Sequence, residues 1–152
     1  MQTTKWILDR ETAIASLRDT RLCLLTYPML IYPNKLFDEL EKLSHKTISR
    51  KQIPDWATFV KEDRDMTSAA FYKVFFDQMD PAELVLLVTD EGHEKGCFFK
   101  FYIHEFMDFS EWYEAYFNRD IFQFSDYVAL FPGLHKMKVT DDEGGVSEID
   151  IW

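Results

Sequence analysis

The chain contains 152 residues with a mass of 18.1 kDa, and its 27 acidic side chains outnumber its 17 basic ones, giving a net charge of −10. Apolar residues make up 47% and aromatic residues 16% of the sequence, which excludes wholesale disorder as well as the collagen-like and disulfide-rich classes. The negative charge argues against conventional duplex binding, because phosphates repel such a protein.

The sequence shows no targeting or membrane segment. Met1–Arg10 lacks the apolar core and small-residue cleavage site of a signal peptide. The longest strongly apolar run, Leu84–Val88, is far shorter than the roughly 20 residues that span a bilayer. Cys23 and Cys97 lie among apolar neighbours and are expected to be buried free thiols. We therefore expect a cytoplasmic protein that does not contact membranes.

Charge is distributed unevenly along the chain. Residues 1–76 carry 12 basic and 10 acidic side chains, whereas residues 77–152 carry 5 basic and 17 acidic ones. This asymmetry indicates a surface for a positively charged partner, although acidity that serves only solubility is the alternative. The one basic stretch, Lys42–Lys51, is interpreted as the solvated end of a helix and its loop.

Helical spacing of apolar residues dominates the first half of the chain. It predicts an amphipathic helix over residues 4–18, and the short apolar run 21–27 favours a strand, with a short helix as the alternative. Pro33 and Pro54 each open a further helix, since proline is tolerated in a first helical turn. A fourth helix is predicted over residues 67–79, with a buried face made of Ala69, Tyr72, Phe76 and Met79.

The apolar period changes in the second half. The continuous run 84–88 predicts a strand covered on both faces, and 97–104 predicts its partner across a turn at 90–96. Asp108 and Glu111 have the spacing of a capping box at the start of an aromatic-rich helix.

A further strand is predicted near residues 127–131. Alternation in 134–140 and 146–152 then predicts a hairpin around a glycine-containing turn. A register in which paired position numbers sum to 286 places Met137 opposite Ile149 on one face. The same register pairs the lysines and acids of the other face, Lys138 with Glu148 and Lys136 with Asp150.

These elements predict one α+β domain over residues 1–152. Its N-terminal helices are expected to precede an antiparallel sheet of four or five strands with one helix packed across it.

Motifs for catalysis, metals and cofactors are missing from the sequence. His104 and Glu105 begin like a zinc-hydrolase helix, but Asp108 stands where the second histidine is needed. The five glycines form no phosphate-binding loop, and no sequence around Ser110 or either cysteine indicates a nucleophile. We therefore predict no catalytic residue, no metal and no cofactor.

One segment, Glu105–Tyr127, mixes many carboxylates with nine aromatic rings. One helical stripe and one short strand would not bury all of these rings. Rings flanked by acids suit a basic protein partner, because the rings supply contact area and the acids steer the encounter. The predicted partner-binding residues are Glu105, Asp108, Glu111, Trp112, Tyr113, Glu114, Asp120 and Asp126.

The leading functional hypothesis is a non-catalytic inhibitor that occludes a basic protein. An immunity protein that neutralises a toxin, above all a nuclease, fits this description, as does a nucleic-acid mimic that blocks a defence enzyme. Direct binding to nucleic acid is not expected. The alternatives are a small hydrolase that uses His104, Glu105 and Asp108, and a small-molecule or peptide sensor with an aromatic pocket.

Overall fold

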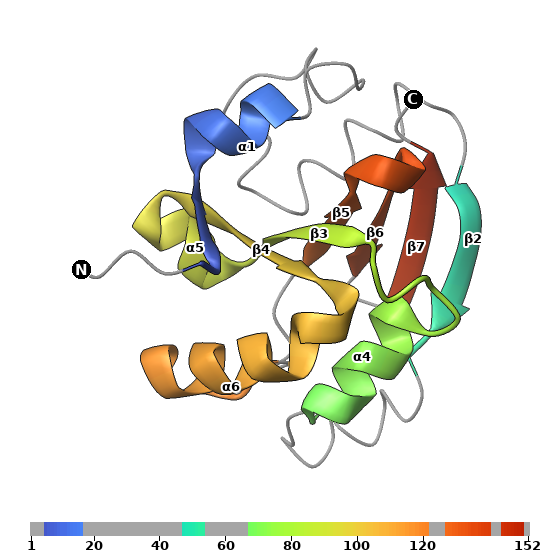
Figure 1. Cartoon of the computed structure of the whole chain (residues 1–152). Coiled ribbons are helices and arrows are strands. Elements are labelled where there is room, and N and C mark those ends of the chain that lie inside the picture. Colours follow the sequence, from blue (N-terminus) through green and yellow to red (C-terminus); the bar gives the residue numbers. More distant parts are fainter. Residues whose placement is uncertain (1–4, 17–46, 54–66, 122–126, 141–143, 151–152) are drawn as a thin grey trace.

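The computed structural model describes residues 5–16, 47–53, 67–121, 127–140 and 144–150, which form an antiparallel sheet with helices on both of its faces (Figure 1). In chain order the elements are β1 (Ile7–Asp9), α1 (Arg10–Ser16), β2 (Thr47–Gln52), α4 (Ser68–Phe76), β3 (Leu84–Val88), α5 (Asp90–Lys95), β4 (Cys97–Tyr102), the 3₁₀-helix η3 (Ile103–Glu105), α6 (Phe106–Phe117), β5 (Val128–Phe131), the 3₁₀-helix η4 (Pro132–Leu134), β6 (Lys136–Thr140) and β7 (Gly145–Asp150).

The seven strands lie in the order β1-β4-β3-β5-β6-β7-β2, and every neighbouring pair is antiparallel. The central strands β3 and β5 are uninterrupted apolar runs because both of their faces are covered. Val85 and Leu87 of β3 join one hydrophobic cluster, whereas Leu86 and Val88 join a second cluster on the opposite face.

Helices α4 and α6 pack on one face of the sheet, and α1 lies on the other (Figure 1). The α4–α6 face holds most of the aromatic side chains. Phe71 of α4 stacks on Phe106 of α6 with ring centres 5.2 Å apart, and Phe109 stacks on Phe101 of β4 at 4.5 Å. These contacts hold α6 firmly across the sheet, since aromatic pairs add to the free energy of burial.

Several sequence predictions are confirmed. The strand at 84–88 has the predicted bounds, β4 covers most of 97–104, and β5 lies within 127–131. The terminal hairpin forms in the predicted register, with Met137 opposite Ile149 and Lys138 opposite Glu148. Cys97 is a buried free thiol.

The predicted count of four or five strands is wrong, and so is the order of N-terminal helices before strands. The expected helix over 4–18 is divided, because Ile7–Asp9 pairs with β4 before α1 begins. Asp9 then caps α1, since its carboxylate accepts the backbone N–H of Thr12 at 2.9 Å and the hydroxyl of Thr12 at 2.6 Å. These hydrogen bonds hold the pKa of Asp9 below its usual range.

Two further segments adopt a different element from the predicted one. Part of the basic stretch 42–51 belongs to β2, an edge strand paired with β7. The turn expected at 90–96 contains the short helix α5, because the Thr89 hydroxyl accepts the N–H of Gly92 at 3.0 Å and so caps its first turn.

The buried face of α4 also differs from the prediction. Phe71, Phe75 and Phe76 are buried, whereas Ala69 is exposed and Tyr72 is half-buried. Met79 lies beyond the helix, which ends at Phe76.

The start of α6 was misplaced as well. The helix begins at Phe106, so Asp108 lies in its first turn instead of capping it. The side-chain hydrogen bond just before the helix is made by Glu105, whose carboxylate accepts the backbone N–H of Tyr102 at 3.1 Å. The strand predicted at 21–27, the helices predicted from Pro33 and Pro54, Cys23 and the tip of the terminal hairpin lie outside the described residues.

Candidate functional site

Apart from Asp126, the predicted binding residues lie on α6 or close to its ends in the chain, and the solvent-facing side of this helix carries charges that no described residue pairs. Asp108 and Glu111 are exposed, lie three positions apart on one helix face, and form no hydrogen bond or ion pair with the described residues. Met107 and Tyr116 are 50% and 41% exposed and, being nine positions apart, lie on opposite flanks of this carboxylate face. Carboxylates and apolar groups are thus available together on the outside of α6.

Trp112 links this surface to the core. Its half-buried ring lies 5.2 Å from the ring of Tyr116 and 6.0 Å from the buried ring of Phe109. Tyr116 therefore stands on a rigid aromatic support, which lowers the conformational entropy it would lose on binding.

Glu105 is not available as a free charge. It forms an ion pair with Lys5 at 2.9 Å and accepts the backbone N–H of Tyr102. The hydrogen bond from Lys5, followed by that from Tyr102, lowers the pKa of Glu105 below its usual range. Its charge is partly neutralised within the molecule.

Tyr113 and Glu114 serve the interior of the protein. Tyr113 is fully buried, and Glu114 accepts hydrogen bonds from the Ser68 hydroxyl and from the backbone N–H of Ile121, each at 3.2 Å. Glu114 therefore ties α6 to α4 and to the chain that follows α6.

Asp120 is exposed beyond the C-terminal end of α6, at the opposite end of the helix from Asp108. Asp126 lies outside the described residues. The structure thus groups Asp108, Glu111 and Trp112 on one surface and leaves Asp120 at its margin.

The histidine and carboxylates of the hydrolase alternative form no comparable site. His104 is exposed and stacks on Tyr102, with ring centres 5.9 Å apart, and Glu105 is engaged by Lys5. A general acid needs a raised pKa, whereas the pKa of Glu105 is lowered. This geometry does not favour acid catalysis at His104 and Glu105.

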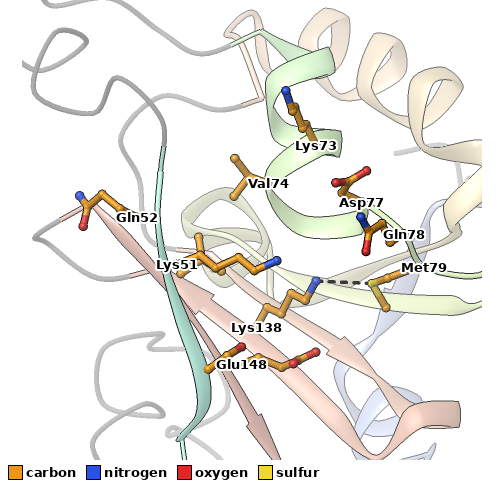
Figure 2. Close-up of a pocket in the computed structure, with 11 residues that line it drawn as sticks. Lys51, Gln52, Lys73, Val74, Asp77, Gln78, Met79, Lys138 and Glu148 are labelled. Atoms are coloured by element: carbon orange, nitrogen blue, oxygen red, sulfur yellow. Dashed lines mark hydrogen bonds between the residues drawn. The ribbon is translucent and has the colours of Figure 1, made fainter.

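A cavity of about 370 Å³ lies elsewhere, between α4 with its following turn and the strands β2, β6 and β7 (Figure 2). Its charged lining residues are Lys51, Lys73, Asp77, Lys138 and Glu148. No residue of α6 lines it, and no aromatic ring does, unlike the pocket expected of the sensor alternative.

Sequence reasoning missed this cavity because its walls come from four separate elements. The hairpin register did predict that Lys138 meets Glu148. The missing signal was strand β2, which places Ser49 opposite Glu148 and Lys51 opposite Val146.

Among the described residues, no three histidine, cysteine, aspartate or glutamate side chains come together as a metal site would require. None of the helices in that part of the chain has the length and apolar character needed to cross a membrane. Comparisons of the chain with protein-family models, with curated proteins and with solved structures found no match.

Proposed function

We propose that this protein is a non-catalytic binding protein that covers a positively charged surface of another protein, with the outward side of α6 at the centre of the contact. The observation that carries the proposal is that the free carboxylates of Asp108 and Glu111 lie between the exposed apolar side chains of Met107 and Tyr116 on the outside of the helix. The four residues define what we call the α6 surface.

Each half of this combination has a physical role in binding. Methionine, tyrosine and tryptophan are enriched in interface cores, because they bury large areas at modest entropic cost. Unpaired carboxylates attract lysine and arginine side chains of a partner and accelerate association when salt is low. The net charge of −10 gives the molecule as a whole a negative electrostatic potential, which also attracts a basic partner.

The partner class follows from this charge. A basic enzyme whose cleft normally holds a nucleic acid presents the arginines and lysines that such a surface attracts. The protein then acts as an immunity protein of a nuclease toxin, or as a nucleic-acid mimic directed against a defence enzyme. Blocking a cleft needs no catalytic group on the inhibitor.

The experiment combines capture with association kinetics. Immobilised protein captures basic proteins from lysate at low salt. The association rate constant of the captured protein is then measured with the wild type, with Glu111→Lys and with Asp108→Lys/Glu111→Lys. We expect the association rate constant to fall about tenfold or more in the double variant, and its salt dependence to weaken.

Glu94→Lys is the matched control, since Glu94 is an exposed glutamate on α5 and its reversal changes the net charge equally. The control should stay within about twofold of the wild type, because its charge lies outside the proposed contact. Equal slowing by Glu94→Lys and Glu111→Lys would contradict the α6 surface as the contact. Failure to capture any basic protein at low salt would contradict the proposed function itself.

A further inference from the structure

The cavity between α4 and the sheet contains a lysine whose ammonium group is only partly satisfied. Lys138 Nζ donates to the backbone carbonyl of Phe75 at 2.6 Å and lies 3.5 Å from Met79 Sδ, which is a weak acceptor. An ammonium group carries three N–H donors, so at least one has no strong acceptor among the described residues.

Burial makes this position costly for a positive charge. Desolvation lowers the pKa of Lys138, and the nearby positive charge of Lys51 lowers it further, while Glu148 and Asp77 oppose the change. An anion placed next to Lys138 would relieve both effects.

A second ammonium group approaches the same space. Lys51, an exposed residue of β2, points toward Lys138 of β6 across the intervening strand β7, as Figure 2 shows. Neither lysine forms an ion pair with a described carboxylate, although Glu148 and Asp77 also line the cavity. An anion that lies between two ammonium groups attracts both of them and offsets their mutual repulsion.

The rim of the cavity contains a residue in an unfavourable backbone conformation. The Met79 N–H donates to the Phe76 carbonyl at 3.1 Å, and Gln78 has a φ of 62°. With Asp77 at φ −57° and ψ 135°, this is a type II turn whose third position normally holds glycine. Strained backbone at non-glycine residues clusters at ligand sites.

We infer that the cavity lined by Lys51 and Lys138 is a binding site for a small organic anion, with one carboxylate or phosphate group and a short aliphatic body. The ammonium groups would take the anionic group. The apolar lining residues Val74, Met79 and Val146 would contact the aliphatic part. The volume of about 370 Å³ lies at the small end of the range for ligand pockets and limits the ligand to a small molecule.

The site is separate from the α6 surface, so the two proposals can fail independently. Three lysines against two carboxylates, Asp77 and Glu148, give the cavity lining a small positive charge in a protein whose net charge is −10.

Backbone-amide NMR titrations test the inference with three probes: butyrate, inorganic phosphate and butylammonium, each compared with chloride at equal ionic strength. We expect saturable shifts confined to residues 49–52, 73–79, 136–140 and 144–148 with butyrate or phosphate, and none there with butylammonium. A response to butyrate alone assigns the anionic group as a carboxylate, and a response to phosphate alone assigns it as a phosphate.

The variants decide which residues bind. Lys51→Met should weaken binding at least about tenfold, and Lys138→Met should abolish it, whereas Lys100→Met on β4 should leave it unchanged. Because Lys51 is exposed, its variant keeps the test valid even if Lys138→Met fails to fold. The inference is overturned if neither anion shifts these amides at tens of millimolar, or if Lys51→Met binds as the wild type does.

Discussion

The hydroxyl of Tyr113 on α6 donates a hydrogen bond to the carboxylate of Glu91 on α5. The same carboxylate forms an ion pair with Arg119 at 2.7 Å, and the Tyr113 oxygen lies 3.1 Å from Thr89 Oγ1, to which it is hydrogen-bonded. Through this network, the N-terminal end of α5 and the C-terminal half of α6 are joined at the end of strand β3. The surface that we propose for partner binding therefore rests on a rigid support.

Removal of the Tyr113 hydroxyl should destabilise the fold without unfolding it. In Tyr113→Phe the ring still packs against Phe99, but the buried Thr89 hydroxyl loses a partner and Glu91 keeps only Arg119 among these contacts. We expect a loss of about 1–3 kcal/mol in the free energy of unfolding, measured by urea denaturation. Tyr116→Phe, at an exposed position, is the control and should change stability by less than about 0.5 kcal/mol. An equal loss in both variants would contradict the role of the network.

Tyr113 should also give the fold a dependence on alkaline pH. Burial, and then the hydrogen bond to Glu91, raise the pKa of Tyr113 well above the ordinary value of 10.0. The unfolded chain ionises this phenol above pH 10.0 and the folded protein does not, so its contribution is complete below that pH and is lost as the pH rises further. Unfolding curves recorded above pH 10.0 should show a smaller alkaline loss for Tyr113→Phe than for the wild type.

The ion pair between Lys5 and Glu105 should matter more for titration than for stability. The pKa of Glu105 is lowered chiefly by Lys5, so Lys5→Met should raise it toward the ordinary value of 4.5, as carboxyl-carbon NMR would show. Because the folded pKa is lowered, this contribution is present above pH 4.5 and disappears as the pH falls through the folded value.

The accompanying loss of stability should stay below about 1 kcal/mol, since the Lys5 side chain is largely exposed. A Glu105 carboxyl that titrates identically in both proteins would contradict the pairing.

The sheet could be predicted where the sequence pattern has one solution. In the terminal hairpin, the alternation of Met137 and Val139 with Lys136 and Lys138 excludes a slip by one residue, which would exchange the two faces, and the pairing of both lysines with acids selects the observed register. The uninterrupted run 84–88 was equally unambiguous. Both predictions rest on local periodicity, which survives in the tertiary structure.

Tertiary contacts decided the features that were missed. Helical spacing around Trp6 concealed β1, which exists because it pairs with β4 at the sheet edge. The capping residue Asp9 was the one local signal of a boundary there. The cavity depends on Lys51 and Lys138, which are far apart in sequence and meet only because β2 and β6 both pair with β7.

The proposed surface was predicted in part for the same reason. The sequence pointed to the acids of α6, and Asp108 and Glu111 are indeed exposed there. It did not reveal that the Tyr113 side chain is buried, or that the Glu114 carboxylate accepts a hydrogen bond from the Ser68 hydroxyl. When aromatic residues occur on several sides of a helix, the sequence does not show which side packs against the sheet.

Gln78 offers a stabilising substitution at the rim of the cavity. Its φ of 62° is unfavourable for a residue with a side chain, and its own side chain is exposed. Gln78→Gly should raise the free energy of unfolding by about 0.5–1 kcal/mol, after allowance for the greater freedom of glycine in the unfolded chain. Asn118→Gly is the comparison, because asparagine tolerates the same conformation better and should gain less. Thermal unfolding of both variants gives the answer, and a loss of stability in Gln78→Gly would show that its backbone is not strained.

Replacing Gly92 by alanine should lower the stability of the fold, whereas the same change at a helical glycine usually raises it. In an exposed helix interior that change stabilises by roughly 1 kcal/mol. A Cβ at position 92, however, would lie 2.9 Å from the backbone oxygen of Cys97 and 3.1 Å from Phe99 Cε2, neither of which can move freely. Gly92→Ala should therefore destabilise the fold by about 1–3 kcal/mol, because α5 must shift away from β4.

Gly133→Ala is the matched control for this substitution, since the new Cβ would approach only the carboxylate of Glu83 at 2.8 Å. That carboxylate ends a flexible, partly exposed side chain and can rotate away, so the control should stay within about 0.5 kcal/mol of the wild type in urea unfolding. If Gly92→Ala proved as stable as Gly133→Ala, the close approach of α5 to β4 would not limit the size of residue 92. If the contact is as close as described, the loss should be recovered neither by salt nor by a change of pH, because it is steric and involves no titrating group.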